Sequence, residues 1–242
     1  MSSLLAACAP AGLSHRTGPA LTLPPELEPQ RARYQADIDA ALEDVTRWFS
    51  EQEVQTPAGP LVREVVVLGG DAAAVRRAFA ERFGMSEAQV PDGFSGTTDG
   101  AVLFLVSRET YQATFRRLYP KETWAEGEYR RLATHEVAHR AHELAAVSLT
   151  GSSEGMGPRW FFEGLALACA GQFQASSPGR LQWKEVTALI KEDAKHPLGY
   201  PRYADMFRSA ARMVPVKNLV ARAGAPDFAE WVAARAALRQ PR

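Results

Sequence analysis

The sequence predicts an α+β fold, in which a small mixed or antiparallel sheet packs on one long helix and a mostly helical half follows. Two runs rich in β-branched and apolar residues, 62–68 (VREVVVL) and 101–106 (AVLFLV), predict strands, and both lie in the first half of the chain. Three- and four-residue spacings of apolar side chains, typical of helices, dominate the remainder. With 46% hydrophobic and 23% charged residues among 242, the chain can build one moderately large domain.

Composition divides the chain into three parts. Residues 1–29 are predicted to be a leader and flexible tether, because the stretch from Ala9 to Pro29 is rich in Pro and Gly. Residues 30–175 are predicted to form the core domain. Residues 176–242 are predicted to form a helical subdomain, which the Ser-Ser-Pro-Gly segment at 176–179 separates from that core.

The elements before residue 120 follow from periodicity and from turn residues. Apolar positions from Gln30 to Glu53 advance by three and four, which predicts an amphipathic helix. After the strand at 62–68, Asp71 is a plausible N-cap for a helix that reaches about Phe83. A loop from Gly84 to Gly100 leads to the second strand, and a helix is expected over 109–118.

The first residues resemble a lipid-attachment signal. Leu5-Ala6-Ala7-Cys8 is similar to the lipobox of bacterial lipoproteins, and this resemblance implies a lipid anchor at Cys8 and an extracytoplasmic location in a bacterium. Met1-Ser2-Ser3 supplies no positive charge, and the apolar run before Cys8 is short, so a cytoplasmic location is the alternative. No stretch approaches 18 consecutive apolar residues, and no transmembrane span is expected.

The segment His135-Glu136-Val137-Ala138-His139 has the HExxH pattern. It lies in a predicted helix from Tyr129 to Leu149, which contains neither Pro nor Gly. Residues four apart share nearly one helix face, so His135 and His139 can direct two imidazole nitrogens to one Zn²⁺. Glu136, rotated by about 100°, can reach a water at that ion and accept its proton.

A third ligand is needed, and Glu163 is the candidate. It is the lone acid within 159–174 (RWFFEGLALACAGQFQ), where aromatic and small apolar residues surround it. A carboxylate in such a setting is costly to bury unless it is paired or coordinates a metal. Pro158 favours a helix that starts here and packs against the first one.

Together, the two segments resemble the gluzincin zinc metallopeptidases. The HExxH helix is followed by Trp160-Phe161-Phe162-Glu163-Gly164-Leu165-Ala166, which matches the W-x-x-E-G-x-A pattern of the bacterial peptidase MA-like members. The resemblance implies a zincin-like fold with one zinc ion, His135, His139 and Glu163 as its ligands, and Glu136 as the general base. The metzincin pattern is absent, because Arg140-Ala141-His142 follows His139. His142 is expected on a solvated helix face.

The resemblance also implies where substrate lies. In gluzincins a strand borders the cleft above the HExxH helix, and its edge pairs with an extended substrate. Here that strand would be 101–106, with 96–100 as the hairpin or loop beside it. Some thermolysin-like enzymes carry an Asp four residues after the glutamate ligand, where this chain has Leu167. The partner of the ligand histidine is then expected among Glu126, Glu128, Asp205 and a backbone carbonyl.

The remainder of the chain is predicted to form the other wall of the cleft. Helices are expected over 181–192, 202–214, 216–222 and 226–238. Tyr203-Ala204 resembles a family element that supplies a stabiliser of the tetrahedral oxyanion. Tyr203 is therefore the first candidate for that role, and Tyr200 and His196 are the others. Cys169, in an Ala-rich apolar helix, is expected to pack as a small hydrophobic residue.

These patterns predict a zinc-dependent metallopeptidase, in which a zinc-bound water activated by Glu136 hydrolyses peptide bonds of a peptide or protein substrate. An endopeptidase is favoured, because the G-x-M-E-N motif of the family's aminopeptidases is absent. Two alternatives stay open: a non-catalytic binding module with a structural zinc, and a zinc hydrolase of a non-peptide ester or amide. Positive and negative side chains balance at 28 each, so no nucleic-acid partner is expected.

Overall fold

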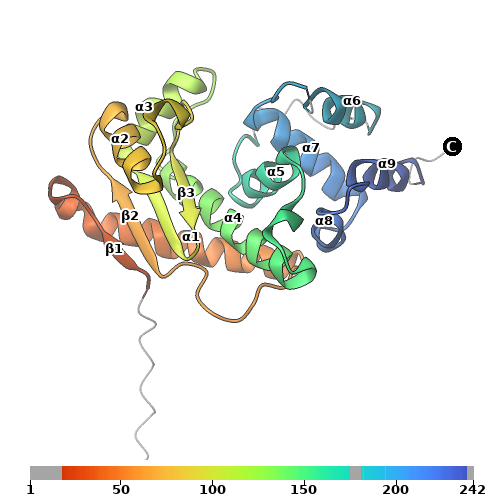
Figure 1. Ribbon diagram of the computed structural model, residues 1–242, viewed down its shortest axis with the longest axis horizontal. Coiled ribbons are helices and arrows are strands. Elements are labelled where there is room, and N and C mark those ends of the chain that lie inside the picture. Colours follow the sequence, from red (N-terminus) through yellow and green to blue (C-terminus); the bar gives the residue numbers. More distant parts are fainter. Residues whose placement is uncertain (1–17, 175–180, 182, 194, 239–242) are drawn as a thin grey trace, which may run out of the picture.

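A four-stranded mixed sheet lies in the N-terminal half of the chain. The computed structural model describes residues 18–174, 181, 183–193 and 195–238 (Figure 1). The strands are β1 (Ala20–Thr22), β2 (Glu64–Leu68), β3 (Gly96–Asp99) and β4 (Val102–Val106), in the order β1-β2-β4-β3. β1, β2 and β4 are parallel, whereas β3 runs antiparallel to β4. This sheet and the mostly helical half that follows confirm the predicted α+β fold class.

The edge strand of the sheet next to the HExxH helix is β3 and not the 101–106 strand, which corrects the expected position of the sheet edge. The 101–106 strand was expected to offer its edge to the cleft, but β4 lies between β2 and β3 and is hydrogen-bonded on both sides. Residues 96–99 form the edge strand instead, joined to β4 by a tight turn at Gly100 with φ of +55°. Its sequence, GTTD, is short and polar, so alternation of apolar residues could not indicate it.

The predicted tether is too long at its C-terminal end. Residues 20–29, assigned to it from their Pro content, contain β1 and most of a 3₁₀ helix, η1 (Pro25–Gln30). β1 pairs with β2, and the buried side chain of Leu27 fixes η1 on the core. Pro24 and Pro25 suit the extended entry and first turn of this helix. Cys8 and the 176–179 segment lie outside the described residues.

Three helices accompany the sheet: α1 (Arg31–Glu51), α2 (Ala72–Phe83) and α3 (Arg108–Leu118). The predicted helical face of α1 is confirmed, because its buried residues recur at three- and four-residue spacings: Tyr34, Ile38, Ala41, Val45 and Phe49. The predicted N-cap of α2 is also confirmed, since the Asp71 carboxylate accepts a hydrogen bond from the Ala74 amide at 2.8 Å.

The motif helix, α4 (Glu128–Thr150), runs between the sheet and the helical half (Figure 1). It contacts α1, β3 and β4 on one side and α5 and α8 on the other. The helices after it are α5 (Arg159–Cys169), α6 (Trp183–Asp193), α7 (Tyr200–Met213), α8 (Val216–Arg222) and α9 (Phe228–Leu238). Two further 3₁₀ helices are η2 (Glu87–Gln89) and η3 (Ser153–Met156).

Helix α5 is fixed between α4 and α7 by close packing. A Cβ added at Gly164 would lie 2.6 Å from the Tyr203 carbonyl oxygen, so only glycine fits there. Trp160, Phe161, Leu165 and Leu167 are all buried on this helix, and Cys169 joins the same core as predicted. This packing fixes the position of α5, and so the point along α4 that Glu163 faces. None of the helices in the described part of the chain is both long and apolar enough to cross a membrane.

Candidate metal centre

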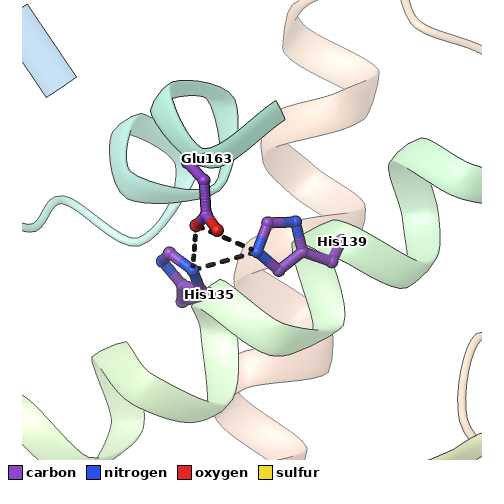
Figure 2. Close-up of side chains that lie close together, drawn as sticks. All are labelled: His135, His139 and Glu163. Atoms are coloured by element: carbon purple, nitrogen blue, oxygen red, sulfur yellow. Dashed lines mark hydrogen bonds and ion pairs between the residues drawn. The ribbon is translucent and has the colours of Figure 1, made fainter. Parts of the chain in front are cut away.

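The three predicted ligands meet at one point, where α5 crosses α4. His135 and His139 project from α4, and Glu163 points at them from α5 (Figure 2). The two Nε2 atoms are 3.0 Å apart. Glu163 Oε2 lies 3.3 Å from His135 Nε2 and 3.5 Å from His139 Nε2. Three ligand-type atoms thus converge from two helices, α4 and α5.

The charge and donor atoms of these three side chains favour a bound cation. Glu163 Oε2 is fully buried and has no aligned hydrogen bond in the described structure. Burial alone would raise the pKa of Glu163, but its contacts with His135 and His139 hold that pKa well below its ordinary value. An ionised, buried carboxylate beside two imidazole lone pairs is costly without a positive charge. His135, His139 and Glu163 could therefore hold a metal ion.

Glu136 lies beside this group without belonging to it. Its side chain is buried, with 8% of its surface exposed. Burial raises its pKa to about 7; the charge of His135 opposes this rise and that of Glu163 adds to it. A carboxylate whose pKa is near neutrality is suited to accept and then release a proton.

A cavity of about 420 Å³ opens over these residues. Glu136, His139 and Glu163 form its floor, and β3 forms one wall with Gly96, Thr97 and Thr98. The remaining lining comes from η3, the start of α5 and Tyr200 (Ser153, Glu154, Met156, Gly157, Phe162 and Tyr200). The edge strand, the carboxylate and the ligand group therefore share one cavity.

Gly96 is the closest approach of the edge strand to Glu136. A Cβ added at this position would lie 2.7 Å from Glu136 Cγ and 3.0 Å from its Cδ. Any larger residue would displace either the strand or the carboxylate, so the glycine lets β3 lie directly over the Glu136 side chain.

Tyr200, not Tyr203, lies in the cavity. The Tyr200 ring stacks on the His135 ring, with centroids 5.6 Å apart and planes 28° apart. The Tyr203 hydroxyl instead donates to Asp193 Oδ1 at 2.7 Å, and its side chain is buried. His196 is exposed after α6 and does not line the cavity. Of the three candidates for the oxyanion donor, Tyr200 is therefore the one that lines the cavity.

The hydrogen-bond partner of His135 Nδ1 is Gln172. His135 Nδ1 lies 3.0 Å from Gln172 Oε1, on the side of the ring opposite the ligand group. The three side chains expected there are engaged elsewhere: Glu126 with Arg33, Glu128 with Arg131 and Asp205 with Arg208. Gln172 was not among the predicted residues; the one signal for it in the sequence is an amide that follows Gly171 within an apolar run.

His142 is buried, which corrects its predicted exposure. It has no exposed surface, and its ring packs edge-on against Phe161, with centroids 5.5 Å apart. Neither ring nitrogen has a hydrogen-bond partner in the described structure. Burial, and then the charge of His139, lowers its pKa to about 3. His142 is therefore neutral, and α5 covers the helix face that was expected to be solvated.

No protein-family model, curated protein sequence or solved structure matches this chain. The assignment of a function therefore depends on the residues of the site itself.

Proposed function

We propose that this protein is a zinc-dependent metallopeptidase of gluzincin type that cleaves within extended peptide segments. The observation that carries the proposal is the convergence of His135, His139 and Glu163 beneath a cavity that also contains Glu136 and a sheet edge. Each component has a chemical use in peptide hydrolysis, and all of them lie within one cavity.

The donor set and its spacing support zinc as the metal. Two imidazole nitrogens and one carboxylate oxygen form a common catalytic zinc set, which leaves a fourth position open. Zinc–ligand bonds of about 2.0–2.2 Å in a tetrahedron require ligand atoms about 3.3–3.6 Å apart. The observed separations of 3.0, 3.3 and 3.5 Å fit this requirement with little movement of the side chains.

The chain's own residues supply the remaining chemistry. Bound zinc acts as a Lewis acid toward carbonyl oxygens and lowers the pKa of water toward neutrality. Glu136 takes the proton of the attacking water and passes it to the leaving amine. The outer edge of β3 offers backbone donors and acceptors to an extended peptide, and this mode of binding tolerates many side chains.

Tyr200 is suited to stabilise the developing oxyanion. Burial holds the pKa of its hydroxyl well above the ordinary value, so the hydroxyl keeps its proton and can donate it. An O–H directed at the oxyanion is worth a few kcal/mol in such a site.

One observation speaks against the alternative of a binding module with structural zinc. Structural zinc sites have four protein ligands. Among the described residues the ligand group has three members, and neither Asp205 nor His196 joins it. Glu136 lies beside these three residues without joining the group. The other alternative, hydrolysis of a non-peptide ester or amide, is distinguished from the proposal by testing peptide and ester substrates.

The test combines metal analysis with substrate cleavage. We expect one zinc per purified chain, loss of that zinc in Glu163→Gln, and fragments of an unstructured protein substrate by mass spectrometry. Glu154→Gln is the matched control, because Glu154 lines the same cavity without joining the ligand group. A wild-type chain that binds no zinc, or that cleaves esters but never peptides, would refute the proposal.

A further inference from the structure

The turn after α5 has an unusual backbone. Gly171 and Phe173 both adopt the left-handed conformation, with φ of +64° and +54°, and Gln172 lies between them. For a large aromatic residue such as Phe173 this conformation is costly, on the order of 1 kcal/mol or more. Such strain persists only where the surrounding structure enforces it.

Arg208 of α7 restrains this turn. Its guanidinium donates one hydrogen bond to the Gln172 carbonyl and another, of 3.2 Å, to the Phe173 carbonyl. The backbone N–H of Gln172 donates to the Leu167 carbonyl at 3.0 Å, and this bond ties the turn to α5. The backbone on both sides of the Gln172 side chain is therefore fixed by two helices.

The side chain held in this way reaches His135. Gln172 is buried, with 7% of its surface exposed, and its Oε1 lies 3.0 Å from His135 Nδ1. Its Nε2 donates to the Tyr111 hydroxyl at 3.4 Å, which sets which end of the amide faces the histidine. A carbonyl oxygen can only accept a hydrogen bond, so His135 Nδ1 carries the proton and Nε2 is left with its lone pair.

We propose that Gln172 is the positioning residue of the ligand His135. It fixes the ring orientation and directs the Nε2 lone pair into the metal centre, and Arg208 holds Gln172 in place. The inference rests on the metal centre of the proposed function but not on peptide cleavage.

The partner is an amide, which has a measurable consequence. A hydrogen-bond acceptor on the far nitrogen of a ligand histidine raises both its affinity for metal and its basicity, and loss of the acceptor costs about 10–100-fold in affinity. A neutral amide is a weaker acceptor than a carboxylate. The Gln172 partner therefore holds the metal less tightly than a glutamate would at the same position.

The experiment measures zinc affinity of the full chain by competition with a chromophoric chelator. Gln172→Leu keeps the shape and removes the acceptor, Gln172→Glu keeps the acceptor and adds charge, and Gln174→Leu repeats the first change on an exposed residue of the same turn. We expect about 10–100-fold weaker binding in Gln172→Leu. Wild-type or tighter binding is expected in Gln172→Glu, and unchanged binding in Gln174→Leu. Thermal unfolding of each metal-free variant checks that it is folded.

Each outcome separates the two proposals. Weakened binding in Gln172→Leu with restoration in Gln172→Glu supports the positioning role, even if the wild type cleaves no peptide. Equal binding in the wild type and Gln172→Leu overturns that role and leaves the proposed function standing. Equal weakening in Gln172→Leu and Gln172→Glu also overturns it, since the acceptor would not be the cause. A wild type that binds no zinc overturns both.

Discussion

At the scale of single residues, the environment of Glu136 depends on contributions from three elements. α4 carries it, α5 supplies the neighbouring Glu163 charge, and β3 places Gly96 against its side chain. Burial by these elements brings the pKa of Glu136 to about 7. A small change in any of them moves the carboxylate relative to the substrate.

Gly96→Ala should impair catalysis without removing the metal. The added Cβ would lie 2.7 Å from Glu136 Cγ, so the carboxylate or the edge strand must shift. A misplacement on the order of 1 Å costs about 100-fold in rate, so kcat/KM should fall by about 10–100-fold. Zinc content should stay at one per chain. Gly127→Ala is the control, because a Cβ there meets nothing within 4 Å. An unchanged kcat/KM in Gly96→Ala would contradict the role assigned to this contact.

The two tyrosines of α7 should respond differently to loss of their hydroxyls. Tyr200→Phe removes a donor from the cavity, and kcat should fall by about 100-fold. Tyr203→Phe breaks the hydrogen bond to Asp193, so the free energy of unfolding should fall by about 1 kcal/mol while kcat is retained. Steady-state kinetics and urea unfolding of both variants distinguish the roles. The reverse pattern would restore Tyr203 as the oxyanion donor.

At the scale of secondary-structure elements, α4 and α5 were predictable because their information is local. The spacing of His135 and His139 requires a helix for both to share one ion, and the lone acid in α5 had few uses other than as a ligand. Gln172 was not predictable, because its role depends on a turn that Arg208 holds from another helix. The edge strand β3 was missed for a similar reason, since pairing with β4 defines it and its composition does not.

The burial of His142 on α4 predicts acid sensitivity. Its pKa is about 3 in the folded protein, against an ordinary value near 6.5 when exposed, so the unfolded chain binds the proton first. Stability should therefore be fully present above about pH 6.5 and be lost as the pH falls toward 3, by up to about 1.4 kcal/mol per pH unit.

His142→Phe should remove this contribution. Urea unfolding at several values from pH 7.5 to 4.5 should show a smaller loss of stability in His142→Phe than in the wild type. His196→Phe changes an exposed histidine and should keep the wild-type slope. Identical slopes in the wild type and His142→Phe would show that the folded protein accepts a proton at His142 in this range.

At the scale of the whole molecule, the candidate metal centre lies where the two halves of the fold meet. α4 packs against the sheet-bearing half and α5 against the helical half, so the three residues that could hold a metal ion lie at the junction of these halves (Figure 1). The fold class and the order of these halves could be predicted from the distribution of strand and helix patterns. The cavity between them could not, because its lining includes Gly96, Met156 and Tyr200, which meet only after folding.

Removal of the metal should lower the melting temperature. A ligand present at about 100 times its dissociation constant stabilises the folded state by about 2.7 kcal/mol. For a domain of this size that corresponds to a shift of about 5–10 °C. Differential scanning fluorimetry with a chelator, and then with zinc restored, measures the shift. Glu163→Gln should show no such response, and an equal response in that variant would place the zinc elsewhere.

The most direct test of the zinc peptidase assignment compares the wild type with Glu136→Gln, measuring bound zinc and cleavage of an unstructured protein in the same samples. In the proposed mechanism Glu136 is the base and not a ligand, so both proteins should hold one zinc per chain. Cleavage should fall by about 100-fold or more in the variant, as loss of a general base requires. Zinc-loaded Glu136→Gln that cleaves at the wild-type rate would contradict the mechanism, and a wild type without zinc would contradict the metal centre.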